Sequence, residues 1–380
     1  MNADRTAAAR ARWSTLASPN DVGFGVYVHV PFCRHKCDYC AFATFTDKSH
    51  LVERYLRALR TEIERAAPSL PEASTIFVGG GTPSHVEAAL LVHALDAIPR
   101  RGDAEFTVEC NPDDVTVDLL GTYRSVGVNR VSLGMQSASP HVLASLGRTH
   151  TPENVARTVD VIATAGIATF NLDVIYGGAG ESLDDWSATL QSVLALGAPH
   201  VSAYGLTVEA GTALADDVTR HPDDDDQADK YDAADDAFAA AGLVNYEISN
   251  WAREGHECRH NAVYWSGGDY AGFGSAAHAH RAGRRSWNVR TPDRFVELIE
   301  DGRSAESSHE MLDEDTRTLE RLQLQLRTRD GVPTSALAVR DVDEMAELVQ
   351  RVAGDRGERF VLTRAGRLLA NEVSLRLRVA

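Results

Sequence analysis

Apolar, strand-like runs alternate with amphipathic, helix-like segments through the first two thirds of the chain. Strand patterns cover residues 25–32, 74–80, 104–110, 129–135, 168–177, 200–205 and 244–249. Helical patterns lie between them, and the one over residues 151–166 begins at Thr151 and Pro152 and ends at a glycine. Six or seven consecutive β–α units predict an α/β fold around a parallel sheet, which is either open or rolled into a barrel.

The alternation stops near residue 290, and the rest of the chain reads as a smaller α/β unit. Residues 313–332 carry leucines at near-helical spacing, which predicts a helix. The pattern over residues 342–354 predicts a second helix, followed by a hairpin strand around residues 359–363 and a final helix. We expect four parts, namely a disordered lead (residues 1–20), a barrel (21–255), a connecting segment (256–290) and a C-terminal domain (291–380).

The chain is acidic, with a formal net charge of −17 over 380 residues. An acidic surface repels nucleic acid, so we expect no nucleic-acid partner, although a local basic pocket remains compatible with this charge. No apolar stretch approaches the roughly 20 residues that span a bilayer, and the N-terminus lacks the apolar segment of a secretory signal. We therefore expect a cytoplasmic protein, in which clustered cysteines are ligands or catalysts rather than disulfides.

Three of the five cysteines, Cys33, Cys37 and Cys40, follow the first predicted strand with the spacing C-x3-C-x2-C. Three thiolates on a [4Fe–4S] cluster leave one iron without a protein ligand, free for a substrate or cofactor. A zinc site with three cysteines and either His29 or His35 is the alternative. Three unliganded buried cysteines fit less well, because charged and polar residues separate them.

Further polar or glycine-rich features stand at the ends of the other predicted strands. Residues 79–84 read GGGTPS after the second strand, Glu109 ends the third and Gln136 the fourth, and Asp173 lies in the fifth. In barrels of parallel strands the active site lies at the carboxyl ends of the strands. These features therefore predict a single cavity at that end of the barrel.

The triple-cysteine motif, with Tyr39 before its last cysteine, and the later GGGTP segment resemble the radical S-adenosylmethionine (SAM) superfamily. The resemblance implies a partial (β/α)6 TIM-like barrel and disfavours zinc. It also implies that Cys33, Cys37 and Cys40 hold a [4Fe–4S] cluster whose open iron binds the amino and carboxylate groups of SAM. Reduction of the bound SAM would yield a 5′-deoxyadenosyl radical.

Longer segments narrow the resemblance to the oxygen-independent coproporphyrinogen III dehydrogenases and their relatives. These segments read YVHVPFCRHKCDYCAF, VECNPDD, RVSLGMQS, LGRTH and NLDVIYG, and the resemblance runs from about Tyr27 to the C-terminus, including a winged-helix-like C-terminal domain. It implies that Glu109 pairs with the SAM ammonium, Arg148 with its carboxylate, and Gln136 and Asp173 with the ribose. The full set of implied SAM contacts is Tyr27, Tyr39, Gly80, Gly81, Thr82, Glu109, Gln136, Arg148 and Asp173. One departure is GGAGE at residues 177–181, where relatives usually carry Gly-Leu-Pro-Gly.

Two features separate the dehydrogenases from the HemW-like heme chaperones of this group. Phe42 stands where the dehydrogenases carry another cysteine, and only 26 residues precede Tyr27. A later H-N-x-x-Y-W segment, His260 to Trp265, and a glycine-rich segment over residues 272–280, which keeps His278, resemble the chaperone branch. The resemblance implies that the chain binds heme and passes it to an acceptor protein.

For the heme iron we predict His260 as the axial ligand, with His256 and Cys258 as alternatives. A packed, hydrogen-bonded core role for His260 is the competing interpretation. The sequence leaves open a coproporphyrinogen dehydrogenase and another radical enzyme as functions. It also leaves open covalent heme attachment, a respiratory membrane enzyme as acceptor with peripheral membrane association, and a homodimer.

Overall fold

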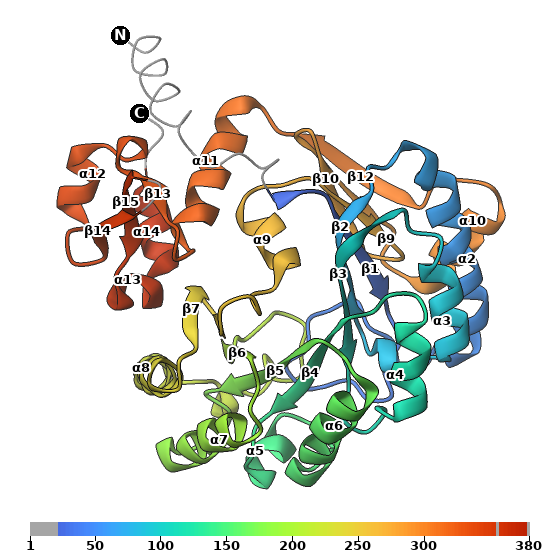
Figure 1. Cartoon of the computed structure of the whole chain (residues 1–380), viewed down its shortest axis with the longest axis horizontal. Helices are drawn as coiled ribbons and strands as arrows, with labels where there is room; N and C mark the ends of the chain where they lie inside the picture. The colour runs from blue at the N-terminus through green and yellow to red at the C-terminus, as the bar shows by residue number, and fades with distance from the viewer. Residues whose placement is uncertain (1–21, 355–356, 378–380) are drawn as a thin grey trace.

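The structure, a computed structural model, describes residues 22–354 and 357–377 (Figure 1). The lead predicted over residues 1–20 lies outside this range. Six parallel strands form the centre of the fold, in the spatial order of the chain: β1 (Gly25–Val30), β2 (Ala73–Gly80), β3 (Arg100–Cys110), β4 (Arg130–Gln136), β5 (Thr169–Tyr176) and β6 (His200–Gly205). The predicted run of six β–α units around a parallel sheet is thus confirmed.

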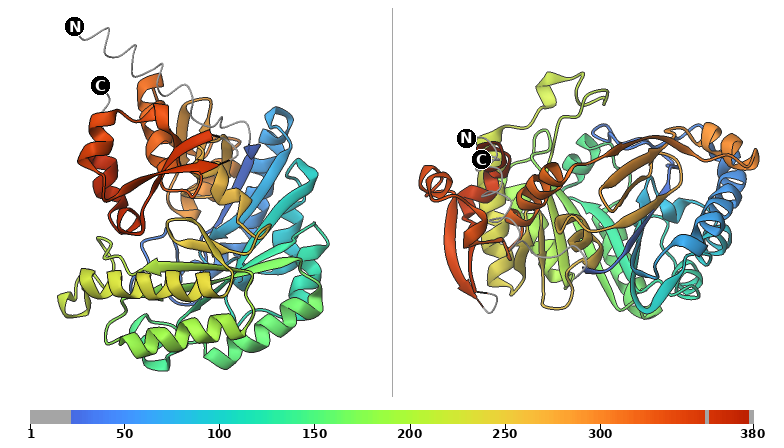
Figure 2. Two further views of the ribbon diagram at one scale, coloured as in Figure 1. Left: turned by 60° about the vertical axis from the view of Figure 1, so that its left-hand side comes forward. Right: turned by 90° about the horizontal axis from the view of Figure 1, so that it is seen from above.

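Helices connect these strands and lie on the outer side of the curved sheet (Figures 1 and 2). They are α2 (Val52–Ala66), α3 (Ala88–Leu95), α4 (Val117–Arg124), α5 (Pro140–Ser145), α6 (Pro152–Ala165), α7 (Leu183–Ala195) and α8 (Asp224–Ala240). The punctuation of α6 is as predicted, because the Thr151 side chain accepts a hydrogen bond from the Asn154 amide and Gly166 ends the helix at φ 69°. Valines, leucines and isoleucines of strands and helices together fill one large core.

Antiparallel strands extend both edges of this sheet. Beside β6 lie β8 (Asn250–Ala252) and β7 (Val244–Glu247). The strand predicted over residues 244–249 is present as β7 and runs in the same direction as β6, but β8 separates the two strands, because both pair antiparallel with β8. At the other edge, β9 (Tyr270–Phe273) runs parallel to β1, and β10 (His278–Arg281), β11 (Arg284–Asn288) and β12 (Glu306–Met311) follow as antiparallel strands. The short helix α9 (Arg259–Trp265) precedes β9.

The C-terminal unit has its own small core and lies to one side of the large sheet (Figure 2). It contains α11 (Glu314–Leu326), α12 (Val339–Glu344), α13 (Arg364–Leu368), α14 (Ala370–Arg376) and an antiparallel sheet of β13 (Val332–Pro333), β15 (Gly357–Leu362) and β14 (Val349–Gly354). Helix α10 (Pro292–Glu300) instead packs in the large core, so the second core starts later in the chain than residue 291. No helix within residues 22–354 and 357–377 is long and apolar enough to cross a membrane.

Candidate functional site

The three clustered cysteines lie on the loop that follows β1. This loop is held to the glycine-rich turn after β2, since the amide of Gly81 donates to the carbonyl of Val30 and the amide of Thr82 to that of Phe32, both at 2.8 Å. Burial raises the pKa of the Cys33 and Cys40 thiols. Two side chains donate to the sulfurs, Thr82 Oγ1 to Cys33 Sγ at 3.5 Å and Arg148 Nη1 to Cys37 Sγ at 3.6 Å. Such donors stabilise thiolates, so the loop fits a group that binds cysteines in their ionised form.

A mononuclear zinc site fits these residues less well. Within the described residues, no group of three or more Cys, His, Asp or Glu side chains is placed to hold a single metal ion. Nε2 of His29 donates to the carbonyl of Ala43 at 3.0 Å, and its Nδ1 lies 3.0 Å from the Tyr27 hydroxyl, so both ring nitrogens are engaged. His35 is exposed. A cluster of several irons, which takes one thiolate on each of three irons, suits the loop better.

The strand ends converge on one cavity of about 530 Å³, as the sequence predicts. Eleven of the predicted site residues line it: Cys33, Cys37, Tyr39, Cys40, Gly80, Gly81, Thr82, Glu109, Gln136, Arg148 and Asp173. They come from the loop after β1, from the carboxyl ends of β2 to β5 and from the segment between α5 and α6. Consecutive parallel strands present their carboxyl ends at the same edge, which explains how distant segments meet here.

Two carboxylates occupy the wall of this cavity. Oε2 of Glu109 accepts a hydrogen bond from the Gly80 amide at 3.1 Å, and burial, with a smaller contribution from the charge of Asp173, raises the pKa of Glu109 to about 8. Burial also raises the pKa of Asp173. Within the described residues neither carboxylate has an ion-pair partner. A cationic ligand group would therefore be stabilised here.

Gln136 reaches the cavity through an unusual backbone conformation. Its φ is 62°, in the left-handed region that non-glycine residues rarely adopt, and the register of β4 against β5 shifts between Gly134 and Gln136. This irregularity lets a residue at the end of a strand turn its side chain into the cavity. Backbone conformations of this kind are concentrated at functional sites.

A network around Asp173 was not predicted from the sequence. Ser132 Oγ donates to Asp173 at 2.7 Å, and the Asn171 side-chain amide donates to Asp173 at 2.8 Å and to Ser202 Oγ at 3.3 Å. Ser132 lies opposite Asn171 in the sheet, and Asp173 lies opposite Ser202. The sequence offers one signal for this network, which is small polar residues in three predicted strands. Only the register of the strands shows that these residues face one another.

The raised pKa of Glu109 predicts a pH-dependent stability. Between its ordinary value of 4.5 and about 8, the folded chain holds a proton on Glu109 that the unfolded chain has released. The stability contributed by this group is complete below pH 4.5 and is lost as the pH rises to 8. We expect the free energy of unfolding of cluster-free Glu109→Gln, measured in urea, to rise relative to that of the native chain as the pH is raised. The rise from pH 5 to pH 8.5 should be on the order of 3 kcal/mol. Glu72→Gln, at an exposed position, is the control. If the difference in stability between the native chain and Glu109→Gln stays constant with pH, the raised pKa of Glu109 is contradicted.

Tyr27 and His260 do not line this cavity. Tyr27 instead lines a second cavity, near β9 to β11 and α11. His260 is buried at 1% exposure, and burial lowers its pKa to about 3. Its Nδ1 lies 2.9 Å from Thr75 Oγ1, its Nε2 lies 2.8 Å from the Tyr264 hydroxyl, and its ring stacks on Phe77. Heme ligation by His260 stays a prediction that would require one of these hydrogen bonds to break, whereas a packed core role needs no change.

The two alternative heme ligands are also engaged. His256 Nδ1 lies 2.7 Å from Thr169 Oγ1. The Cys258 thiol donates to Glu105 at 3.6 Å, and burial raises its pKa to about 12. A thiol with so high a pKa is protonated and therefore a poor iron ligand.

Comparisons with known proteins agree with this geometry. Residues 27–193 match the radical SAM superfamily, which implies a [4Fe–4S] cluster and SAM. Proteins named heme chaperone HemW are similar over most of their length. The one from Mycobacterium tuberculosis is 41% identical over 92% of this chain and 93% of its own, and the one from Bacillus subtilis is 33% identical over 91% and 97%.

Among solved structures, coproporphyrinogen III oxidase (HemN) from Escherichia coli superposes with a TM-score of 0.81 at 21% identity, covering 94% of this chain and 92% of its own. At that identity the likeness shows the fold alone. The matches at 33% and 41% identity span nearly the whole of the relatives. The chain therefore belongs to the HemW family within the radical SAM superfamily.

Proposed function

We propose that the chain is a heme chaperone, which binds heme and transfers it to an acceptor protein while carrying a [4Fe–4S] cluster and SAM. The observation that carries this proposal is the similarity, over more than nine tenths of the chain, to proteins named heme chaperone HemW. Phe42 supports the proposal, because the dehydrogenases carry a further cysteine at this position. In this chain the Phe42 side chain is 68% exposed. Oxidative decarboxylation of coproporphyrinogen is therefore not the function we favour.

In this proposal Cys33, Cys37 and Cys40 hold the cluster, which with SAM supplies one-electron reductive chemistry when bound. The residues of the chain position the ligand. Glu109 binds the ammonium and Arg148 the carboxylate of its amino-acid part, and the two lie in one cavity without carboxylate or cationic partners among the described residues. Ser132 and Asn171 orient Asp173 toward a hydroxyl-bearing group. Gly80 and Gly81 let the backbone approach the ligand.

A second candidate, a radical enzyme acting on an unidentified substrate, is favoured by one observation. All of the residues that the resemblance implies for SAM, with the exception of Tyr27, line the cavity. A heme carrier has no evident need of a radical. A respiratory membrane enzyme as acceptor, peripheral membrane association, a cytoplasmic location and a homodimer stay predictions.

An anaerobic heme titration of the cluster-loaded chain tests the proposal. We expect saturation near one heme per chain in the Soret band, and no conversion of coproporphyrinogen III with SAM and reductant. Release of the bound heme to apomyoglobin, followed in the same band, tests transfer. Absence of saturable binding would overturn the chaperone function, and turnover of coproporphyrinogen would replace it with the dehydrogenase.

A further inference from the structure

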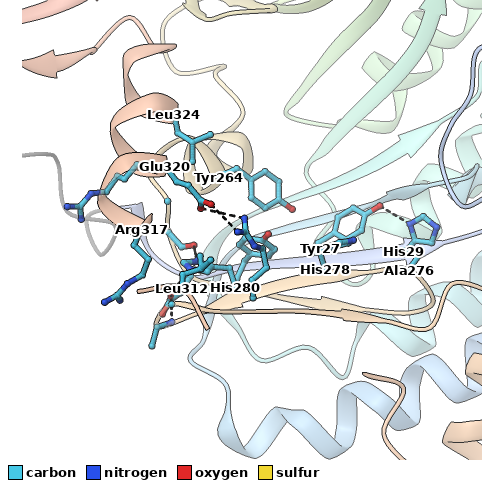
Figure 3. A pocket seen from close by; sticks show the side chains of 18 of the residues that line it. Tyr27, His29, Tyr264, Ala276, His278, His280, Leu312, Arg317, Glu320 and Leu324 are labelled. Atoms are coloured by element: carbon cyan, nitrogen blue, oxygen red, sulfur yellow. Dashed lines mark hydrogen bonds and ion pairs between the residues drawn. The ribbon is translucent and has the colours of Figure 1, made fainter. Parts of the chain in front are cut away.

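A second, larger cavity of about 950 Å³ lies between the antiparallel edge of the large sheet and helix α11 (Figure 3). Its volume falls in the roughly 300–1,000 Å³ range of ligand-binding pockets. Part of its wall is apolar and aromatic, and comes from Tyr264, Tyr270, Leu312 and Leu324. The two tyrosine rings meet edge to face, with 4.7 Å between their centroids. Such walls suit the faces of a flat, largely apolar ligand.

The charged lining of this cavity contains guanidinium groups without ion-pair partners. Arg285 is paired, since it donates to Glu310 at 2.7 Å and to Glu320 at 3.0 Å. Three others, Arg290, Arg317 and Arg321, have no carboxylate within ion-pair distance in the part of the chain that the structure describes.

Arg317 and Arg321 lie one turn apart on α11, which places them on one face of the helix. Nε of Arg321 is buried and has no hydrogen-bond partner. Burial, and then the charge of Arg317, lower the pKa of Arg321. Three carboxylates line the cavity. Glu320 accepts hydrogen bonds from Arg285, and Asp269 lies 3.8 Å from His280. Glu314 is the remaining lining carboxylate, against the three unpaired arginines. In a chain of net charge −17, this local positive excess indicates a site for an anion with more than one carboxylate.

Strand β10 brings two imidazoles to the same cavity. His278 and His280 are two residues apart on the strand, so their side chains lie on one face. Nδ1 of His280 donates to the carbonyl of Gly268 at 3.0 Å, which fixes the tautomer and leaves the lone pair on Nε2. Histidines that bind metals are usually oriented by a hydrogen bond of this kind. His278 stacks on Trp287 at 5.8 Å and is more exposed.

We infer that this cavity is the heme site, with the two propionates on Arg317 and Arg321 and the iron on Nε2 of His280. The inference rests on the proposed function and names the site that it requires. Ala41 and Phe42, just after Cys40, line both cavities. The bound heme would thus lie against the loop that carries the three cysteines.

The test is heme titration of the cluster-loaded full chain, with thermal unfolding as a check of folding. We expect Arg317→Gln/Arg321→Gln to raise the dissociation constant about tenfold or more, because the variant loses two charge-assisted contacts to carboxylates, one of them from the partly buried Arg321. The matched control, Arg57→Gln/Arg294→Gln, removes the same charge from exposed surface and should bind like the native chain. We expect His280→Ala to shift the Soret band and the ferric spin state, and to shift them more than His278→Ala, which removes the other imidazole that lines the cavity.

Heme dimethyl ester is the second probe, because it lacks free carboxylates. It should bind the native chain more weakly than heme and should not distinguish the native chain from the double arginine variant. If the native chain binds heme and the double arginine variant binds it equally well, the site is overturned while the chaperone function stands. A Soret shift in His278→Ala but not in His280→Ala would overturn the iron ligand. If the native chain binds no heme, the proposed function itself fails.

Discussion

Replacing Cys37 with serine is expected to remove the [4Fe–4S] cluster. The loop offers three thiols, and the loss of one leaves only two protein ligands. The variant also loses the sulfur to which Arg148 donates, at 3.6 Å. We expect bound iron and acid-labile sulfide after anaerobic reconstitution to fall more than about tenfold relative to the native chain. The paramagnetic signal of the reduced cluster should disappear with them.

The two remaining cysteines provide matched controls. Cys110 and Cys258 also line the 530 Å³ cavity, but they lie on β3 and before α9 rather than on the loop. Burial raises the pKa of both thiols far above the ordinary range, so neither is a ready source of thiolate. Cys110→Ala and Cys258→Ala should therefore retain native iron. If one of these alanine variants loses iron while Cys37→Ser keeps it, the cluster does not sit on the loop.

The order of elements could be predicted because periodicity and punctuation agree along the first 205 residues. Apolar strands with helices between them allow few arrangements, and a short crossover places each strand beside the previous one. The convergence of Glu109, Gln136 and Asp173 followed from that arrangement alone. The glycine-rich turn after β2 could be placed in the same way, since it ends a buried strand.

The remaining features depend on contacts between distant segments. The helix predicted over residues 342–354 is a helix only as far as Glu344, and Val349–Gly354 form β14. Pairing with β15 outweighs a weak helical pattern there, and Val349 and Val352 suit a strand. His260 shows the same limitation, because its residue type suggests a ligand, whereas its burial and both hydrogen bonds come from β2 and α9. The second cavity also required the structure, since α11 and β10 are far apart in the sequence.

Gly81→Ala is expected to disrupt both the fold and SAM binding, and it tests why glycine follows the two glycines that end β2. A Cβ at this position would lie 2.7 Å from the carbonyl oxygen of Phe32 and 2.8 Å from that of Val30. Both atoms are backbone atoms, one from the last residue of β1 and one from the loop that carries the cysteines, so no side chain can rotate to make room. The loop must move away from β2 and lose hydrogen bonds that the amides of Gly81 and Thr82 now donate.

We expect the free energy of unfolding of the cluster-free Gly81→Ala variant to fall by about 2–4 kcal/mol in urea titrations. Isothermal titration of the cluster-loaded variant should show SAM affinity reduced by about tenfold or more, because the loop and the turn both line the cavity and their contact sets their positions. Gly121→Ala is the control, since Gly121 lies inside α4 and a Cβ there would meet no atom within 4 Å beyond its chain neighbours and its own helix backbone. That variant should be as stable as the native chain, or more stable by up to about 1 kcal/mol, because alanine favours helices. Native stability and native SAM affinity in Gly81→Ala would show that the loop accommodates a methyl group, and that the close approach of backbone to backbone does not hold the cysteines in place.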